Sequence, residues 1–524
     1  MKKLSLSLFL GTSLLLLVAS CQKQLLTLTD VSPENEIAGI TNEWAENPYK
    51  LNVVYFIPTD NDSVANYRKR ISRILLDAQS FFAENLEREG FGRRSFGLDL
   101  VNDSLINIVT VRGESGAATY PYSGGSGAVK TEVDAYFAAN PTQKKSDHYL
   151  IILPSRSGDP LNPGGVPFYG TGRYCYALDY AHMDAKYLGT SGTYGNLATK
   201  WIGGLVHELG HGLNGPHNYG TVSATAAHGT ALMGSGNSTY GRNPTYITKT
   251  SSAIFSNSQT FSWTNRADWH QNFNFSLKNL RSSVVDGKIV LSGNFESQQA
   301  INYVAAYFDR EPYGNNLDYD AITFGANSIN NDSLYIECPL SDFQNRSGIY
   351  QLRIHFIAPN GLRKTEHFML SFDNQLPNLE SVFRTELSNR QSWTVTSSGD
   401  QSGSPVTNIL DGNLSTNWHT PWSPRETLHP HHFVIDAQTI QQFNTLVVYN
   451  RSSLNGALSQ FRLQTSTDGV NWLTAGTYSL PRYAGANYVN LGSTLSTRYI
   501  RVESINSHGN FNYTHMAEFD ILLR

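Results

Sequence analysis

The chain contains very little cysteine: its 524 residues include only Cys21, Cys175 and Cys338. This excludes the dense disulfide framework that holds many small secreted domains together. Cys175 and Cys338 lie far apart in the sequence, and nothing in their spacing favours a disulfide between them. Hydrophobic residues make up 40% and aromatic residues 12% of the chain, so its domains must be stabilised by hydrophobic cores and by any ions that they bind.

The sequence also lacks an excess of charge and lacks long apolar segments. Its formal net charge is −4, without the basic bias typical of nucleic-acid binding, so we expect no nucleic-acid partner. Apart from residues 4–18, no stretch is apolar enough to span a bilayer. Residues 4–18 follow Lys2 and Lys3 and are too few for a comfortable span, which is typical of an export signal.

The end of this signal indicates how the chain is anchored. Residues 18–21 (VASC) resemble the lipobox of bacterial lipoproteins. The resemblance implies that residues 1–20 are a signal peptide that is removed, that Cys21 carries lipid, and that residues 21–45 form a tether. It places the protein in the bacterial cell envelope, lipid-anchored outside the cytoplasm, on the periplasmic or the cell-surface side. An uncleaved anchor and plain secretion are the alternatives.

The length predicts three or four domains, and the sequence patterns change character along the chain. Residues 46–272 are typical of a mixed α/β domain, with buried strands predicted at 51–57 and 149–153. A helical apolar period begins at Val64, and Asp62 or Ser63 is suited to cap that helix.

The rest of the chain has β patterns. Residues 350–356 alternate between apolar and polar side chains, which is the period of a half-buried strand, and Asp286-Gly287 is a hairpin signal. For residues 273–378 we expect an immunoglobulin-like β-sandwich that acts as a spacer. Residues 379–524 again have β patterns. The predicted fold class is therefore multidomain: an α/β domain followed by two all-β sandwiches.

Residues 207–217 (HELGHGLNGPH) carry the strongest chemical signal. His207 and His211 lie about 40° apart around a helix and about 6 Å apart along it, so both rings project from one face. Two neutral imidazoles suit a borderline ion such as zinc. Glu208 follows His207 directly and can reach a water on that ion without binding the ion itself.

A third histidine requires the helix to end. A helix continued to His217 would carry that side chain about 9 Å beyond His211 and to another face. Asn214 and Gly215 tolerate positive φ, and Pro216 cannot continue a helix, so the chain can turn and bring His217 back to the ion. Three protein ligands leave a fourth position for water, which is typical of a catalytic zinc site.

This stretch resembles the long zinc signature of the metzincin peptidases, H-E-x-x-H-x-x-G-x-x-H, with Asn214 in place of the usual Gly. The resemblance implies a metzincin-like domain in which Met233 forms the methionine turn under the metal; an ordinary core methionine is the alternative. Some metzincins carry a tyrosine two residues after that methionine, but Ser235 stands there, so the group on the oxyanion side is left unassigned. Metzincins hold substrate along an edge strand, which we predict at residues 174–180, with an ordinary strand as the alternative.

The implied activity is that of a zinc-dependent endopeptidase. Zinc lowers the pKa of its water, Glu208 acts as general base, and the hydroxide attacks a peptide carbonyl. A non-catalytic surface adhesin with a vestigial metal site is one alternative, although Glu208 argues against it. A zinc hydrolase acting on a non-peptide amide or ester is the other.

Residues 379–524 carry a second resemblance. Residues 409–413 (ILDGN), 416–419 (TNWH), 466–472 (STDGVNW) and 499–503 (YIRVE) resemble motifs of the coagulation factor 5/8 type C, or discoidin-like, domain. The resemblance implies a galactose-binding-like β-sandwich, with Trp418 and Trp472 in its core.

The second resemblance also implies two ligand sites. Family members often hold a structural calcium, and the matching residues here are Asp411, Asn413, Thr416 and Glu518. A tight turn closed by an Asx hydrogen bond is the alternative. Many such domains bind terminal galactose-type glycans: His419 follows Trp418 as in sugar-binding members, and Arg451 lies in a plausible loop, with ordinary exposed polar side chains as the alternative. A glycan-binding domain would concentrate the enzyme on glycoprotein substrates.

Overall fold

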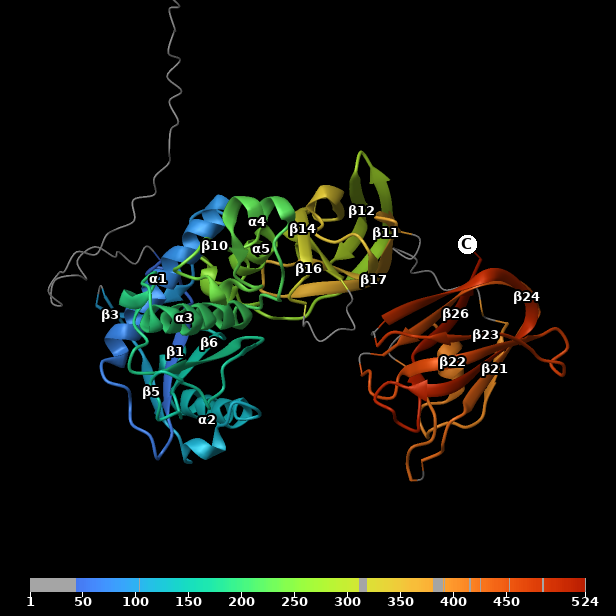
Figure 1. Cartoon of the computed structure of the whole chain (residues 1–524), viewed down its shortest axis with the longest axis horizontal. Helices are drawn as coiled ribbons and strands as arrows, with labels where there is room; N and C mark the ends of the chain where they lie inside the picture. The colour runs from blue at the N-terminus through green and yellow to red at the C-terminus, as the bar shows by residue number, and fades with distance from the viewer. Residues whose placement is uncertain are drawn as a thin grey trace, which may run out of the picture. The chain divides into compact units, whose positions relative to one another are not determined.

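A computed structural model describes residues 44–102, 104–310, 318–379, 390, 392–413, 416–424, 426–451, 453–482 and 485–523 (Figure 1). The predicted signal peptide, Cys21 and nearly all of the predicted tether lie outside these residues. No helix in the described ranges is long and apolar enough to cross a membrane.

The N-terminal region is built on a mainly parallel sheet with strand order β2-β1-β6-β8-β7, and β5 also pairs with β1. These strands are β1 (Lys50–Ile57), β2 (Gly97–Leu98), β5 (Val109–Arg112), β6 (Tyr149–Pro154), β7 (Gly170–Thr171) and β8 (Tyr174–Asp179). Only β7 pairs antiparallel. The strands predicted at 51–57 and 149–153 are confirmed, and both are buried along almost their whole length, as expected for a sheet covered on both faces.

Helices cover this sheet on opposite sides, with α3 (Thr193–Gly212) above and α2 (Ser126–Ala139) below in Figure 1. The remaining elements of the region are α1 (Tyr67–Arg88), β3 (Leu100–Asn102), β4 (Leu105–Ile106), α4 (Val222–His228), β9 (Thr230–Ala231), β10 (Thr245–Tyr246) and α5 (Lys249–Ser256).

The predicted start of the first helix is wrong. Helix α1 begins at Tyr67, and Asn66 before it is left-handed with φ of 57°. The Val64 backbone N–H donates to the Tyr55 hydroxyl, so the tertiary structure holds the residues after Asp62 and Ser63 outside the helix.

The middle region contains two antiparallel sheets, as expected for a β-sandwich. One holds β11 (Phe275–Val285), β12 (Lys288–Ser297) and β15 (Ser333–Pro339); the other holds β14 (Ile322–Asn327), β13 (Tyr303–Arg310), β16 (Gly348–Ile357), β17 (Arg363–Asp373) and β18 (Leu376–Asn378). The alternation predicted at 350–356 is confirmed, because its apolar residues are buried in the core between the sheets. The β11–β12 hairpin turns at Asp286-Gly287 with positive φ at both residues.

The middle region also packs directly against the α/β region. Tyr303, Ala305, Tyr307, Ala321 and Ile357 belong to the same cluster of buried side chains as β1, β6 and α3. A spacer role does not account for this shared core, so the expectation of a mere spacer needs correction.

The C-terminal region is an antiparallel β structure. Its main sheet has the order β19-β21-β24-β22-β23, with β26 beside β21; its strands are β19 (Thr394–Ser397), β21 (His431–Asn450), β22 (Leu458–Ser466), β23 (Leu473–Ser479), β24 (Gly485–Ser507) and β26 (Glu518–Leu522). A small second sheet pairs β20 (Trp418–His419) with β25 (His515–Met516). Trp418 lies in the core as predicted, whereas Trp472 is only partly buried and lies outside the core cluster.

Candidate functional site

The end of α3 has the turn that a third histidine requires. Asn214 has φ of 67°. Its backbone N–H donates to the His211 carbonyl at 2.9 Å, and the Gly215 N–H donates to the Gly210 carbonyl at 2.9 Å. These two hydrogen bonds form a Schellman motif, with Asn in the left-handed position that glycine usually takes. The helix therefore stops after Gly212, and the chain reverses toward its own last turn.

This reversal brings His207, His211 and His217 together. One ligand atom from each of the three lies within 4.8 Å of the other two. The Nε2 atoms of His211 and His217 are 2.9 Å apart, and the His207 Nε2 is buried without a hydrogen-bond partner. Acceptor lone pairs facing one another at this distance are unfavourable unless a proton or a cation lies between them, so the donor set fits a metal ion.

Backbone carbonyls fix the orientation of two of these rings. The His207 Nδ1 lies 2.7 Å from the Leu232 carbonyl oxygen, and the His211 Nδ1 lies 2.7 Å from the Gly215 carbonyl oxygen. Each Nδ1 therefore carries the proton and donates it, which leaves Nε2 free as a metal ligand. Burial, with the neighbouring histidines, lowers the pKa of His207 to about 3 and that of His211 to about 4, so both are neutral at neutral pH.

Met233 lies beneath this site. A Cβ added to Gly210 would lie 2.3 Å from the Met233 sulfur, so only glycine lets the helix approach so closely. Leu232, next to Met233, accepts the hydrogen bond from His207, and the Met233 carbonyl accepts from the Asn218 N–H. The segment Leu232–Met233 thus contacts both ends of the histidine motif.

Glu208 lies beside the histidines and is partly buried. Burial raises its pKa to about 7, although the Gly170 backbone N–H acts in the opposite direction. Glu208 can therefore both accept and release a proton near neutral pH.

The strand next to Glu208 differs from the prediction. Strand β8, predicted at 174–180 as the edge strand, is buried and lies inside the sheet. The edge is β7, which pairs antiparallel with β8 and passes so close to α3 that a Cβ on Gly170 would lie 2.2 Å from the His211 Cβ. The aromatic residues of 174–180 mimicked a half-exposed strand, but both faces are covered.

Tyr319, which the sequence did not reveal, lies against the histidines. Its ring stacks on His217 with centroids 3.7 Å apart and lies 6.2 Å from the His207 ring. Burial, followed by the charge of Glu208, raises its pKa, so the phenol stays protonated. Tyr319 belongs to the middle region, about a hundred residues after the motif, and no local pattern marks it.

Backbone pairing fixes Tyr319 at this place. The Tyr219 N–H donates to the Ala321 carbonyl at 2.7 Å, so the segment after His217 pairs with the segment after Tyr319. Asp318, which has φ of 68°, forms an ion pair with Arg353 of β16. The middle region thus supplies a tyrosine side chain to the site. Ser235, at the position where some metzincins carry a tyrosine, has no phenol.

Further aromatic side chains lie near β7. Tyr122 is 58% exposed, and its ring lies edge-on to Tyr169, the residue before β7, with centroids 6.0 Å apart. Tyr122 also interacts electrostatically with Tyr319. These rings offer exposed apolar faces close to the histidines.

In the C-terminal region, His419 and Arg451 lie in one cluster. Arg451 lowers the pKa of His419 after the larger effect of burial, and its Nη1 lies 3.5 Å from the Asn417 amide oxygen. The His419 ring lies 5.0 Å from Tyr513 and 6.3 Å from Trp422, which is 54% exposed. Sequence reasoning missed these two aromatic residues, although an exposed tryptophan beside His419 could have been a signal.

The residues matched to a calcium site have other partners. The Glu518 carboxylate accepts from the Gly412 and Asn413 backbone N–H groups and pairs with Arg390 at 2.8 Å. The Asp411 carboxylate accepts from the Asn413 N–H and the Thr416 hydroxyl, each at 2.8 Å. The ion pair with Arg390 offsets the charge of Glu518, although the Glu518 Oε2 accepts no hydrogen bond from the described residues, and calcium here stays a prediction.

Comparison with known proteins finds relatives for two parts of the chain. Residues 392–519 match the F5/8 type C domain. Galactose oxidase from Gibberella zeae is 30% identical over 138 residues, which span only a fifth of that protein.

Crystal structures of OgpA from Akkermansia muciniphila resemble a larger part of the chain. Wild-type OgpA is 37% identical with a TM-score of 0.63, and the match covers 66% of this chain and 99% of OgpA. Catalytic inactive OgpA, known in complex with an O-glycopeptide (glycodrosocin) substrate, is also 37% identical, with a TM-score of 0.62, over 64% of this chain and 97% of its own. The chain therefore belongs to the protein family of OgpA and contains an F5/8 type C domain.

Proposed function

We propose that this protein is a zinc-dependent endopeptidase that cleaves O-glycosylated proteins. One observation carries the proposal: three imidazole Nε2 atoms converge beside Glu208 in a chain that belongs to the family of OgpA. His207, His211 and His217 would hold the ion. When bound, zinc supplies a Lewis acid that activates water and polarises a peptide carbonyl.

Glu208 moves the proton in this proposal. Its carboxylate takes a proton from the attacking water and delivers it to the nitrogen of the leaving amine. The raised pKa of Glu208, which results from burial, suits both steps. The structural reason for this burial is the close passage of β7 over α3 at Gly170.

Tyr319 stabilises the charge that develops on the carbonyl oxygen. Its hydroxyl donates a hydrogen bond, and its raised pKa keeps the proton in place. Because the ring is stacked on His217, the donor is held before the substrate arrives, and little reorganisation is needed in the reaction.

The proposed substrate class follows from the aromatic surroundings and from the family. Tyr122 and Tyr169 present ring faces beside the edge strand, where a sugar next to the scissile bond would stack. In the C-terminal domain, His419, Arg451 and Trp422 would bind a terminal galactose-type glycan and raise the local substrate concentration. Lipid on Cys21 would keep the enzyme in the cell envelope.

The decisive experiment compares the wild-type protein with Glu208→Gln on an O-glycopeptide and on the same peptide without sugar. We expect the wild-type protein to contain zinc and to cleave only the glycopeptide efficiently. Glu208→Gln should retain zinc and lose cleavage, whereas Glu87→Gln, an exposed control on α1, should leave cleavage unchanged.

The other outcomes separate the competing functions. Zinc without peptide cleavage would indicate a zinc hydrolase of another amide or ester. A protein with neither zinc nor cleavage would be a non-catalytic adhesin, and a Glu208→Gln variant as active as the wild type would refute the proposed mechanism.

A further inference from the structure

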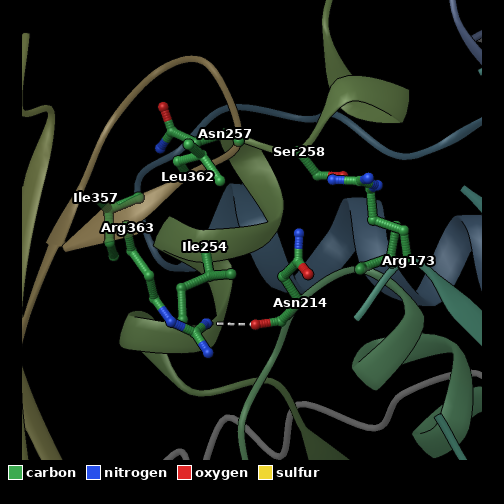
Figure 2. Close-up of a pocket in the computed structure, with 10 residues that line it drawn as sticks. Arg173, Asn214, Ile254, Asn257, Ser258, Ile357, Leu362 and Arg363 are labelled. Carbon is green, nitrogen blue, oxygen red and sulfur yellow. Dashed lines mark hydrogen bonds between the residues drawn. The ribbon is translucent and has the colours of Figure 1, made fainter. Parts of the chain in front are cut away.

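A cavity of about 170 Å³ lies behind the Asn214 turn, between the α/β region and the middle region (Figure 2). It is lined by Arg173, Leu213, Asn214, Ile254, Asn257, Ser258, Ile357, Gly361, Leu362 and Arg363. The lining includes two arginines and several aliphatic side chains but no acidic residue. Arg173 and Arg363 stand on opposite sides of the cavity, with Asn214 between them (Figure 2).

The positive charge of Arg363 has no acidic partner. Its guanidinium donates to the Asn214 backbone carbonyl, and no ion pair to it is present within the described part of the chain. Burial, rather than any neighbouring group, is the main cause that lowers its pKa. Arg363 is only partly exposed, and a guanidinium bonded only to a neutral carbonyl there is unfavourable, because the lost hydration is not replaced by an opposite charge.

Arg173 adds a second positive charge to the cavity lining. Within the described residues its guanidinium has no hydrogen bond or ion pair. Its positive charge contributes to the lowered pKa values of three neighbours, His148, His270 and Asp147. The Asp147 carboxylate is already paired with Lys144 at 2.8 Å.

We propose that this cavity binds a small organic carboxylate. The carboxylate would bind Arg173, whose guanidinium has no other partner among the described residues, since guanidinium groups bind carboxylates through charge-assisted hydrogen bonds. The aliphatic tail would contact Leu213, Ile254 and Leu362. A cavity of about 150 Å³ accommodates benzene, which has six heavy atoms, so an acid such as butyrate, also with six, has a suitable size.

Occupancy would strengthen the metal site. Arg363 holds the carbonyl of Asn214, the residue whose left-handed conformation returns His217 to the other two histidines. A bound carboxylate would offset one of the two positive charges, and its aliphatic tail would pack against the residues of this turn. Binding itself does not depend on the proposed peptidase activity, whereas any effect on cleavage rests on that activity.

The test measures binding of sodium butyrate to the full zinc-loaded protein by calorimetry and by thermal unfolding, at constant chloride. At ligand about a hundred times Kd, we expect Tm to rise by about 2–4 °C. Arg173→Gln should weaken binding at least about tenfold, as expected for the loss of a charge-assisted hydrogen bond. Arg242→Gln, an exposed arginine outside the cavity, is the matched control and should bind like the wild type.

The remaining outcomes decide the identity of the ligand. Equal binding by wild type and Arg173→Gln, no binding of butyrate, or stabilisation by sulfate but not by butyrate would each overturn the proposal. A capped, uncharged glycopeptide carries no carboxylate of its own. If butyrate stimulates cleavage of this substrate, the carboxylate that acts at the cavity is a free one. Because heat stability is read separately, a protein without peptidase activity can still confirm or refute the cavity site.

Discussion

Two clusters of polar residues match metal-site patterns in the sequence, and the folded chain treats them differently. At the histidine cluster, the Nε2 atoms face one another and the His207 Nε2 has no partner. At the Asp411–Glu518 cluster, backbone N–H groups donate to one oxygen of each carboxylate, and Arg390 forms an ion pair with the other Glu518 oxygen. Arg390 already pairs with the Glu518 carboxylate, whereas the His211 and His217 Nε2 atoms face each other, so the presence of a basic partner, rather than the residue types, distinguishes the two clusters.

Removing one histidine ligand should have the largest effect. We expect His217→Ala to lower zinc content and to reduce kcat/KM for an O-glycopeptide by at least about 10³-fold, because catalysis requires the ion. Elemental analysis and cleavage assays measure both effects. His228→Ala, on α4 and outside the cluster, is the control; full activity in His217→Ala would contradict the assignment of this ligand.

Breaking the ion pair at the second cluster should reduce stability rather than activity. Arg390 and Glu518 are almost fully buried, and removing one partner of such a pair costs about 3–5 kcal/mol. We expect Arg390→Gln to expose the C-terminal domain to faster hydrogen exchange, with unchanged cleavage of a short peptide.

A chelation experiment sharpens the comparison. If Arg390 compensates Glu518, a calcium-specific chelator should leave hydrogen exchange of the wild-type domain unchanged. A marked loss of protection on chelation would instead show that calcium occupies the Asp411 turn.

Residues close together in sequence could be predicted, and residues brought together by tertiary structure could not. The helix, the Asn214 turn and the strands at 51–57 and 149–153 follow from local patterns. Tyr319 reaches the site only because the middle region packs on the α/β region, and the pairing of Tyr219 with the segment after Tyr319 has no local signature. The edge strand was misplaced for a similar reason, since β7 has only two residues.

The next substitution tests whether Tyr319, a residue of the middle region, contributes to catalysis. Because Tyr319→Phe keeps the ring that stacks on His217 and removes only the hydroxyl, we expect zinc content and KM to be unchanged. Loss of an oxyanion donor should lower kcat about 10²–10³-fold. Tyr335→Phe, an exposed tyrosine on β15, should be fully active. Equal kcat in Tyr319→Phe and wild type would leave the ring with a packing role alone.

The smallest expected effect concerns the glycan cluster, in which His419 of β20 lies near Trp422. The exposed Trp422 ring, near His419, is positioned to stack on a sugar, so Trp422→Ala should weaken galactose binding about tenfold. Cleavage of a short glycopeptide should stay constant, whereas cleavage of a large glycoprotein should slow, because only the large substrate benefits from tethering. Trp263→Ala removes an equally exposed tryptophan elsewhere and should change neither rate. If both substrates slow equally in Trp422→Ala, the C-terminal domain does not act by concentrating substrate.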